Sequence, residues 1–183
     1  MEAKFQLTAG FCLFGALCVL VLPIPWLMGA MTAAVIHEVF HCIAVWLCGG
    51  KIRRFTLAAG GAKIETSPLL PGQSVLCALA GPLGSLCTLH FAECLPEAAV
   101  CGLIQGIYNL IPIYPLDGGR ALRFFLPNAV CAGVEVFCLT VASGLSLALG
   151  VHQRDLGAAL LLCLWFPVIQ RKISCKEGKQ AVQ

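Results

Sequence analysis

Charged residues are scarce in this sequence: Asp, Glu, Lys and Arg together make up 11% of its 183 residues. Soluble domains carry about 25% charged residues, so this shortage argues against an ordinary soluble domain. Hydrophobic residues make up 59% of the chain, and several apolar runs approach the ~20 residues that cross a bilayer. The sequence therefore predicts an all-α polytopic membrane protein in contact with the lipid bilayer.

Three further patterns are missing. The 12 cysteines contain no C-x-x-C pair and lie mostly inside apolar runs, so we interpret them as small helix-packing residues. Cys94 and Cys101 are left as the one pair that a disulfide could join. No A-x-A cleavage site separates the first apolar run from the second, which favours a retained anchor over a signal peptide. No internal repeat is visible.

The apolar runs and the proline and glycine residues between them predict about six transmembrane helices and a small β-hairpin after the second. The hairpin is predicted over Arg53–Glu65, as two short strands around Ala59, Gly60 and Gly61. We expect residues 1–172 to form a single integral membrane domain and residues 173–183 a short cytoplasmic tail. The predicted spans are 5–22, 27–48, 74–90, 98–111, 133–150 and 156–169.

Basic residues are distributed unevenly between the two sides that six spans create. Eleven of the twelve Lys and Arg residues fall on the side of the termini, and only Arg154 falls on the other. Because positive loops stay in the cytoplasm, both termini of this multi-pass chain are predicted to be cytoplasmic. The asymmetry accounts for the net charge of +3, so no nucleic-acid partner is expected.

The stretch "HEVFH" places ionisable groups inside the second predicted span. His37 and His41 are four residues apart, so their imidazoles project about 40° apart on one helix face, one turn above the other. Both imidazoles can reach one metal ion, while Glu38 between them can hold a water molecule. This is the H-E-x-x-H arrangement of two zinc ligands and a general base. The alternative is a polar cluster that hydrogen-bonds to neighbouring helices. Ionisable groups are costly in a membrane, which favours the metal site.

A catalytic zinc ion takes three protein ligands and keeps one open position, so a further ligand is needed. His90 and His152 fall at the far ends of their spans, and Glu135 falls near the start of the fifth. The better candidate is Asp117, in "YNLIPIYPLDGGRALRF", where prolines and glycines break regular helix. Irregular backbone at membrane depth is tolerated where it is buried or lines a cavity. An ordinary surface turn with the same composition is the alternative.

These two stretches together resemble the site-2 protease family of intramembrane zinc metalloproteases. The family's N-x-x-P-x-x-x-L-D-G pattern matches Asn109, Pro112, Leu116, Asp117 and Gly118, and "LAGPLGS" (79–85) resembles its A-G-P stretch. The layout is most similar to the sporulation branch, which processes a membrane-associated pro-sigma factor, in the bacterial cell membrane. The resemblance implies one Zn²⁺ on His37, His41 and Asp117, catalysis by Glu38 with help from Asn109, and regulated intramembrane proteolysis.

The expected partners are a membrane-spanning or membrane-associated protein substrate and an inhibitory membrane protein. The hairpin could take up substrate as an added strand at Ala59, Gly60 and Gly61, or it could be a plain connection. Two other functions stay open. A catalytically silent adaptor that sequesters such clients is opposed by the complete set of His37, Glu38, His41 and Asp117. An ion transporter would need polar residues on several spans, and the other spans nearly lack them.

Overall fold

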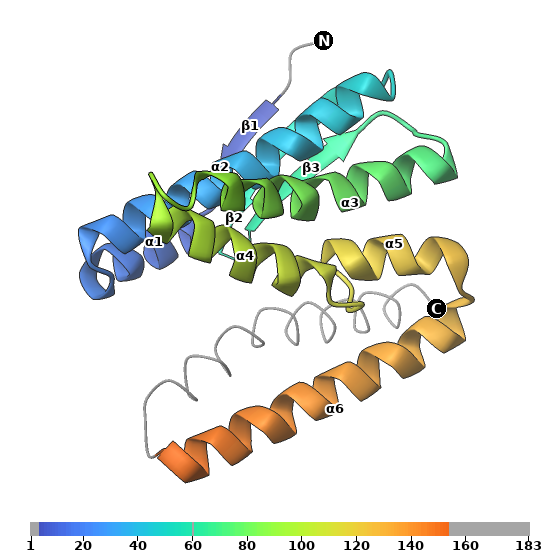
Figure 1. Cartoon of the computed structure of the whole chain (residues 1–183). Coiled ribbons are helices and arrows are strands. Elements are labelled where there is room, and N and C mark those ends of the chain that lie inside the picture. The colour runs from blue at the N-terminus through green and yellow to red at the C-terminus, as the bar shows by residue number, and fades with distance from the viewer. Residues whose placement is uncertain (1–3, 60, 154–183) are drawn as a thin grey trace.

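The computed structural model describes residues 4–59 and 61–153, with side chains up to Ala142, and it is mostly helical (Figure 1). A small sheet covers one side of the helices. The predicted sixth span, 156–169, and the predicted tail lie outside the described residues. The described elements in chain order are β1 (Lys4–Leu7), α1 (Ala9–Val21), α2 (Ile24–Leu47), β2 (Ile52–Ala58), β3 (Gly61–Thr66), α3 (Pro71–Cys87), the 3₁₀-helix η1 (Thr88–Phe91), α4 (Pro96–Leu110), α5 (Asp117–Phe125) and α6 (Asn128–Gln153).

The sheet contains three strands in the order β1-β2-β3, where the sequence had predicted a two-stranded hairpin. Strands β2 and β3 form the predicted antiparallel hairpin, and β1 pairs with β2 in parallel. The predicted start of the first helix, near Phe5, is therefore wrong, because residues 4–7 form β1 and the helix begins at Ala9. Thr8 caps α1 by accepting a hydrogen bond from Phe11 N, which ends the strand and begins the helix. Apolarity alone does not separate a strand from a helix over four residues.

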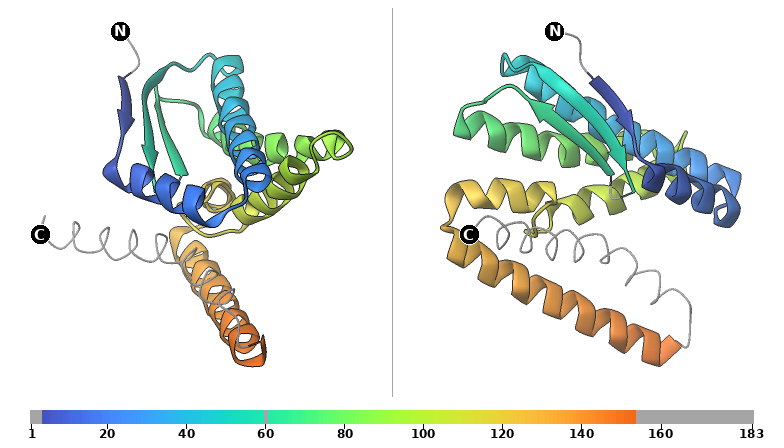
Figure 2. Two further views of the ribbon diagram at one scale, coloured as in Figure 1. Left: turned by 90° about the vertical axis from the view of Figure 1, so that its left-hand side faces the viewer. Right: turned by 180° about the vertical axis from the view of Figure 1, so that it is seen from behind.

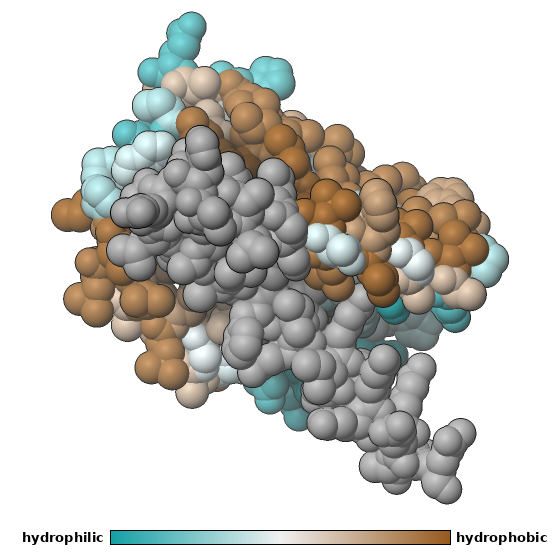
Figure 3. Space-filling view, turned by 90° about the horizontal axis from the view of Figure 1, so that it is seen from below, coloured by the Kyte–Doolittle hydropathy of each residue, from teal (hydrophilic) through white to brown (hydrophobic). Residues whose placement is uncertain are grey.

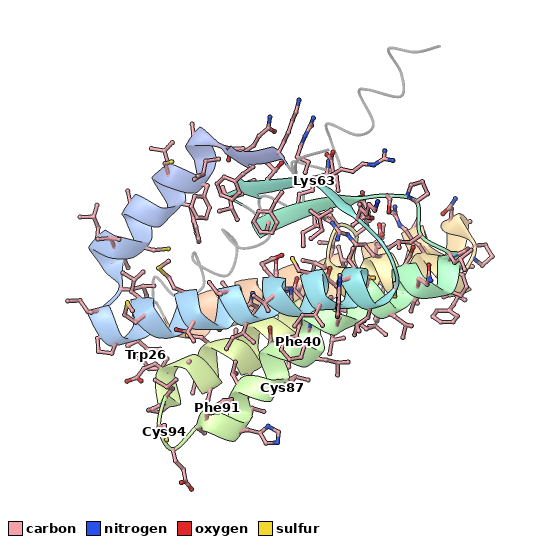
Figure 4. All side chains as sticks on the ribbon, turned by 90° about the horizontal axis from the view of Figure 1, so that it is seen from above. Trp26, Phe40, Lys63, Cys87, Phe91 and Cys94 are labelled. Carbon is pink, nitrogen blue, oxygen red and sulfur yellow. The ribbon has the colours of Figure 1, made fainter. Side chains whose placement is uncertain are left out.

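Helix α3 lies at the centre of the described helices, with α2 and α4 packed on it and α5 below (Figures 1 and 2). Small residues make this close packing possible. Gly84 of α3 faces the ring of Phe40, which Figure 4 shows on α2. The buried positions of α3 are accordingly almost all small: Val75, Cys77, Ala78, Gly81, Pro82, Gly84 and Ser85.

Large hydrophobic side chains cover the outside of the described helices, and Figure 3 shows this apolar surface from below. Two stretches, Ile24–Leu47 and Pro71–Phe91, are long and apolar enough to cross a membrane. The shorter apolar stretches Ala9–Val21 and Asn128–Ala142 overlap two more predicted spans, 5–22 and 133–150. Exposed apolar surface of this extent is unfavourable in water and indicates a membrane protein.

Helices α5 and α6 form a second layer. The segment between α4 and α5 is irregular, as its prolines predicted, and its Tyr114–Pro115 peptide bond is cis. Ile113 in this segment is fully buried and packs against Cys138, Leu139 and Ala142 of α6. The sequence did not predict α5 as a helix, because it is only nine residues long and begins inside the proline-rich segment.

Candidate metal centre

Three predicted ligands meet in the structure. His37 Nε2 and His41 Nε2 each lie 3.2 Å from Asp117 Oδ2, and the two Nε2 atoms lie 3.1 Å apart. The two imidazoles come from successive turns of α2 and meet edge to face, while the carboxylate comes from the first turn of α5. The fold therefore brings residues 76 positions apart into one triangle of donor atoms.

The orientation of His41 is set by a backbone carbonyl of the neighbouring helix. His41 Nδ1 lies 2.6 Å from the carbonyl oxygen of Cys77, which can only accept a hydrogen bond. His41 therefore carries its proton on Nδ1 and donates it to Cys77. In the neutral imidazole this leaves the lone pair of Nε2 directed at the Asp117 carboxylate.

His37 has the same kind of support from a side chain. Its Nδ1 lies 2.8 Å from the hydroxyl of Ser85, and both groups are buried. Histidine ligands commonly bond to an outer partner through the nitrogen that does not face the metal, and the partner fixes the ring. Helix α3 thus supports both histidines of α2, through Cys77 and Ser85.

Gly81 explains how α3 approaches the histidines closely enough. A Cβ atom at position 81 would collide with the imidazole of His41. Any larger residue would push α3 away from α2 or turn the imidazole out of place. The glycine of the "AGPLG" stretch is therefore part of the site, because its missing side chain lets α3 approach His41 closely.

Asp117 is buried and is the first residue of α5. A carboxylate is favourable there because the helix N-terminus carries partial positive charge. Its two oxygens face different groups: Oδ2 faces the histidines, and Oδ1 lies 3.6 Å from Arg120 Nη1, one turn along the helix. Asp117 is thus held in a fixed orientation by its own helix.

The donor set fits zinc. Two imidazole nitrogens and one carboxylate oxygen are the ligand types and the number that catalytic zinc sites use. Ligand atoms about 2.0–2.1 Å from a tetrahedral ion lie roughly 3.3–3.4 Å from one another, close to the observed 3.1–3.2 Å. Among the described residues, these three form the group of His, Cys, Asp or Glu side chains that could hold a metal ion.

Glu38 follows His37 on α2 and is half-buried. In the part of the chain that the structure describes, it makes no hydrogen bond or ion pair. Its carboxylate is therefore available for a proton, a water molecule or a substrate.

The other predicted site residues lie away from these three ligands or in other contacts. Asn109 donates its side-chain N–H to the carbonyl of Gln105 in its own helix, and its predicted catalytic role stays a prediction. Ala59 lies beside the start of α1, next to Gly10, and Gly61 begins β3. Gly60 lies outside the described residues. The predicted uptake of substrate at this turn is untested.

The other candidates for the third ligand do not belong to the metal-binding group among the described residues. His90 is exposed on η1, and the side chain of His152 is outside the described part. Glu135 is buried, where it accepts hydrogen bonds from Tyr114 N and Arg123. Cys94 and Cys101 are free, as are the other described cysteines.

Sequence reasoning missed the outer partners of the site, which are Ser85, the Cys77 carbonyl and Arg120. One signal was present, because Gly81 and Ser85 are four residues apart and so share a helix face. A backbone carbonyl carries no sequence signal at all.

Comparisons with known proteins agree with this geometry. The structure resembles the site-2 protease from Methanocaldococcus jannaschii with a TM-score of 0.64, over 93% of this chain and 91% of that chain, at 21% identity. A 121-residue alignment at 31% identity joins the chain to a protein of Synechocystis described as "Putative zinc metalloprotease". That alignment covers 54% of this chain and 32% of the relative. No family model matches the chain.

The sporulation branch is named by neither comparison and stays a prediction. The structural likeness shows that the chain has the fold of a site-2 protease, and the two comparisons together confirm the resemblance to the site-2 protease family that its two motifs indicated.

Proposed function

We propose that this chain is an intramembrane zinc metalloprotease that hydrolyses a peptide bond of a membrane-spanning or membrane-associated client. The observation that carries the proposal is the triangle of His37, His41 and Asp117, together with Glu38, which has no hydrogen-bond or ion-pair partner in the described part of the chain. An H-E-x-x-H helix alone would support only metal binding. A carboxylate from a second helix supplies the third ligand that a catalytic site needs.

In this proposal His37, His41 and Asp117 hold the metal, and Ser85, Cys77 and Arg120 hold the ligands. Bound zinc would supply a Lewis acid that polarises the scissile carbonyl and acidifies a water molecule. Glu38 takes the proton from the attacking water and gives it to the leaving amine nitrogen. Glu38 performs both transfers, so it must be free of a permanent partner, and among the described residues it has no hydrogen-bond or ion-pair partner.

The client must present an extended backbone, because a helix keeps its peptide groups in internal hydrogen bonds. Within the described sheet β2 is central, so β1 and β3 each have an edge that could pair with such a segment. The apolar outer surfaces of α1 and α2 support a location in the same bilayer as such a client. Regulated proteolysis, with an inhibitory membrane partner, is part of this proposal.

The test uses Glu38→Gln, which keeps the size of the side chain and removes its basicity. Purified wild type and variant in proteoliposomes are incubated with a panel of single-span membrane proteins, and fragments are quantified by mass spectrometry. General acid–base assistance contributes about 10²–10⁴-fold, so we expect cleavage to slow by at least ~10²-fold with zinc content unchanged.

Two results would contradict the proposal. Wild-type cleavage by a zinc-replete Glu38→Gln protein would exclude Glu38 as the base. Tight binding of clients by the wild type without any cleavage would favour the adaptor function instead.

A further inference from the structure

Glu135 lies at a junction of three elements, close to α5 but outside the group of metal ligands. It is buried, with 3% of its surface exposed, although it is ionisable. Its Oε1 lies 3.1 Å from the backbone N of Tyr114 and 3.1 Å from Arg123 Nη2. The Arg123 guanidinium also lies over the Tyr114 ring, 4.0 Å from its centroid. Glu135 of α6 therefore binds the segment before α5 and the last turn of α5 at the same time.

The two residues that Glu135 binds lie before and after Asp117 in the chain. Tyr114 comes three residues before it, and Arg123 six residues after it on the same short helix. Leu116 N donates to Ile113 O, and Arg120 N donates to Leu116 O, so hydrogen bonds connect the segment to the helix without a gap. A displacement of Tyr114 or of the end of α5 would move Asp117 with it.

Apolar packing cannot replace this contact. Ile113 buries its side chain against α6, but such contacts are non-directional and tolerate sliding. Hydrogen bonds to a charged acceptor are directional and stronger than those between neutral groups. The Glu135 contacts thus define where α5 stands along α6.

We propose that Glu135, through Tyr114 and Arg123, is a positioning residue for the metal site that sets the place of Asp117 relative to His37 and His41. This inference rests on the proposed function, since it assigns Glu135 a part in the same metal centre. The set of Glu135, Tyr114 and Arg123 is called the α5 clamp below.

Substitutions separate the two contacts of the clamp. Glu135→Gln keeps an oxygen that accepts the Tyr114 N–H and loses the charge opposite Arg123. Glu135→Ala removes both contacts. Arg123→Gln removes the pairing with the end of α5 and leaves the acceptor of Tyr114 in place. A matched control is Glu65→Ala, which breaks the exposed ion pairs of Glu65 with Arg54 and Lys63 on the sheet.

The experiment measures zinc affinity of the purified proteins in detergent by competition with a chromophoric chelator, and the visible spectrum of the Co²⁺-substituted forms. Outer partners of metal ligands typically contribute 10–100-fold in affinity. We expect Glu135→Ala to weaken zinc binding by ~10-fold or more, with a Co²⁺ spectrum altered by the weaker carboxylate ligand. Glu135→Gln should lie between Glu135→Ala and wild type, and Glu65→Ala should bind zinc like the wild type.

A purely structural role would lower the melting temperature and leave the zinc affinity and Co²⁺ spectrum of the folded protein unchanged. That result for Glu135→Ala would overturn the inference. If Glu135→Ala does not fold, wild-type affinity in both Glu135→Gln and Arg123→Gln would overturn it equally. A wild-type protein that binds no zinc would instead refute the proposed function.

Discussion

Two buried carboxylates, Asp117 on α5 and Glu135 on the neighbouring helix α6, differ in the groups that face them. Glu135 faces donors: the Tyr114 N–H and the Arg123 guanidinium both point hydrogen atoms at its Oε1. Asp117 Oδ2 faces the Nε2 atoms of His37 and His41. Because His41 donates its Nδ1 proton to Cys77, the neutral ring offers Asp117 a lone pair.

Because of this difference in neighbouring groups, Glu135 is neutralised by protein donors, whereas Asp117 and the histidines form a site that can take a cation. Buried charges are stable only when they are paired or coordinate a metal. Glu135 is satisfied by the protein itself, so it stabilises the fold without any ligand. The neutral His41 ring and the Asp117 carboxylate direct two lone pairs at each other across 3.2 Å, and such an arrangement is stabilised when a positive charge lies between them. A buried carboxylate is thus complete without a ligand in one region and is left available for an ion in the other.

The largest expected effect comes from breaking the ion-binding side with Asp117→Ala. Loss of a direct ligand should exceed the 10–100-fold cost of losing an outer partner, so zinc affinity should fall by more than ~10²-fold and cleavage should disappear. Metal analysis after dialysis measures this. The melting temperature in chelator should change little, unlike that of Glu135→Ala, which leaves Arg123 unpaired. Glu93→Ala, at an exposed carboxylate, is the control, and full zinc occupancy in Asp117→Ala would show that another residue is the third ligand.

A smaller effect is expected from Gly81→Ala, which tests whether α3 must approach His41 closely. The added Cβ collides with the imidazole, and overpacking of this kind costs about 1–3 kcal/mol. Zinc affinity should fall by roughly 10-fold or more as the imidazole turns away.

Gly72→Ala is the matched control for that substitution, because it lies on the same helix and has nothing within 4 Å of the added atom. It should keep wild-type zinc binding. Equal zinc affinity in the two variants would mean that the contact between Gly81 and His41 does not matter for the site.

The smallest expected effect is that of Ser85→Ala, which removes the outer partner of His37 and leaves all three ligands. We expect zinc binding to weaken by ~10-fold, at the low end for such partners, because His37 keeps its place on α2. Isothermal titration of the metal-free protein measures the change. An affinity above that of the wild type would indicate that Ser85 constrains the ring unfavourably.

Much of the helical part was predictable from apolar runs alone. The bounds of α2, α3 and α4 agree with the predicted spans to within three residues and those of α6 to within five, because long apolar runs between Pro or Gly favour helices. The start of α1 and the parallel strand β1 were not predicted. Strand β1 exists through its pairing with β2, some fifty residues away, and such a partner leaves no periodic mark on a four-residue segment.

The sequence by itself determined the candidate ligands. His37, Glu38 and His41 follow from helical spacing, and Asp117 from a proline-rich segment that could not be a plain membrane helix. The sequence favoured Asp117 over Glu135 as the third ligand, and only the tertiary structure shows that Asp117 lies 3.2 Å from both histidines while Glu135 binds Tyr114 N and Arg123. The physical reason is the direction of hydrogen bonds: α3 aims the Cys77 carbonyl and the Ser85 hydroxyl at the histidines, while Tyr114 and Arg123 occupy Glu135. The position of a backbone carbonyl and the distance between two helices cannot be read from the amino-acid sequence. They determine which carboxylate faces the lone pair of a histidine.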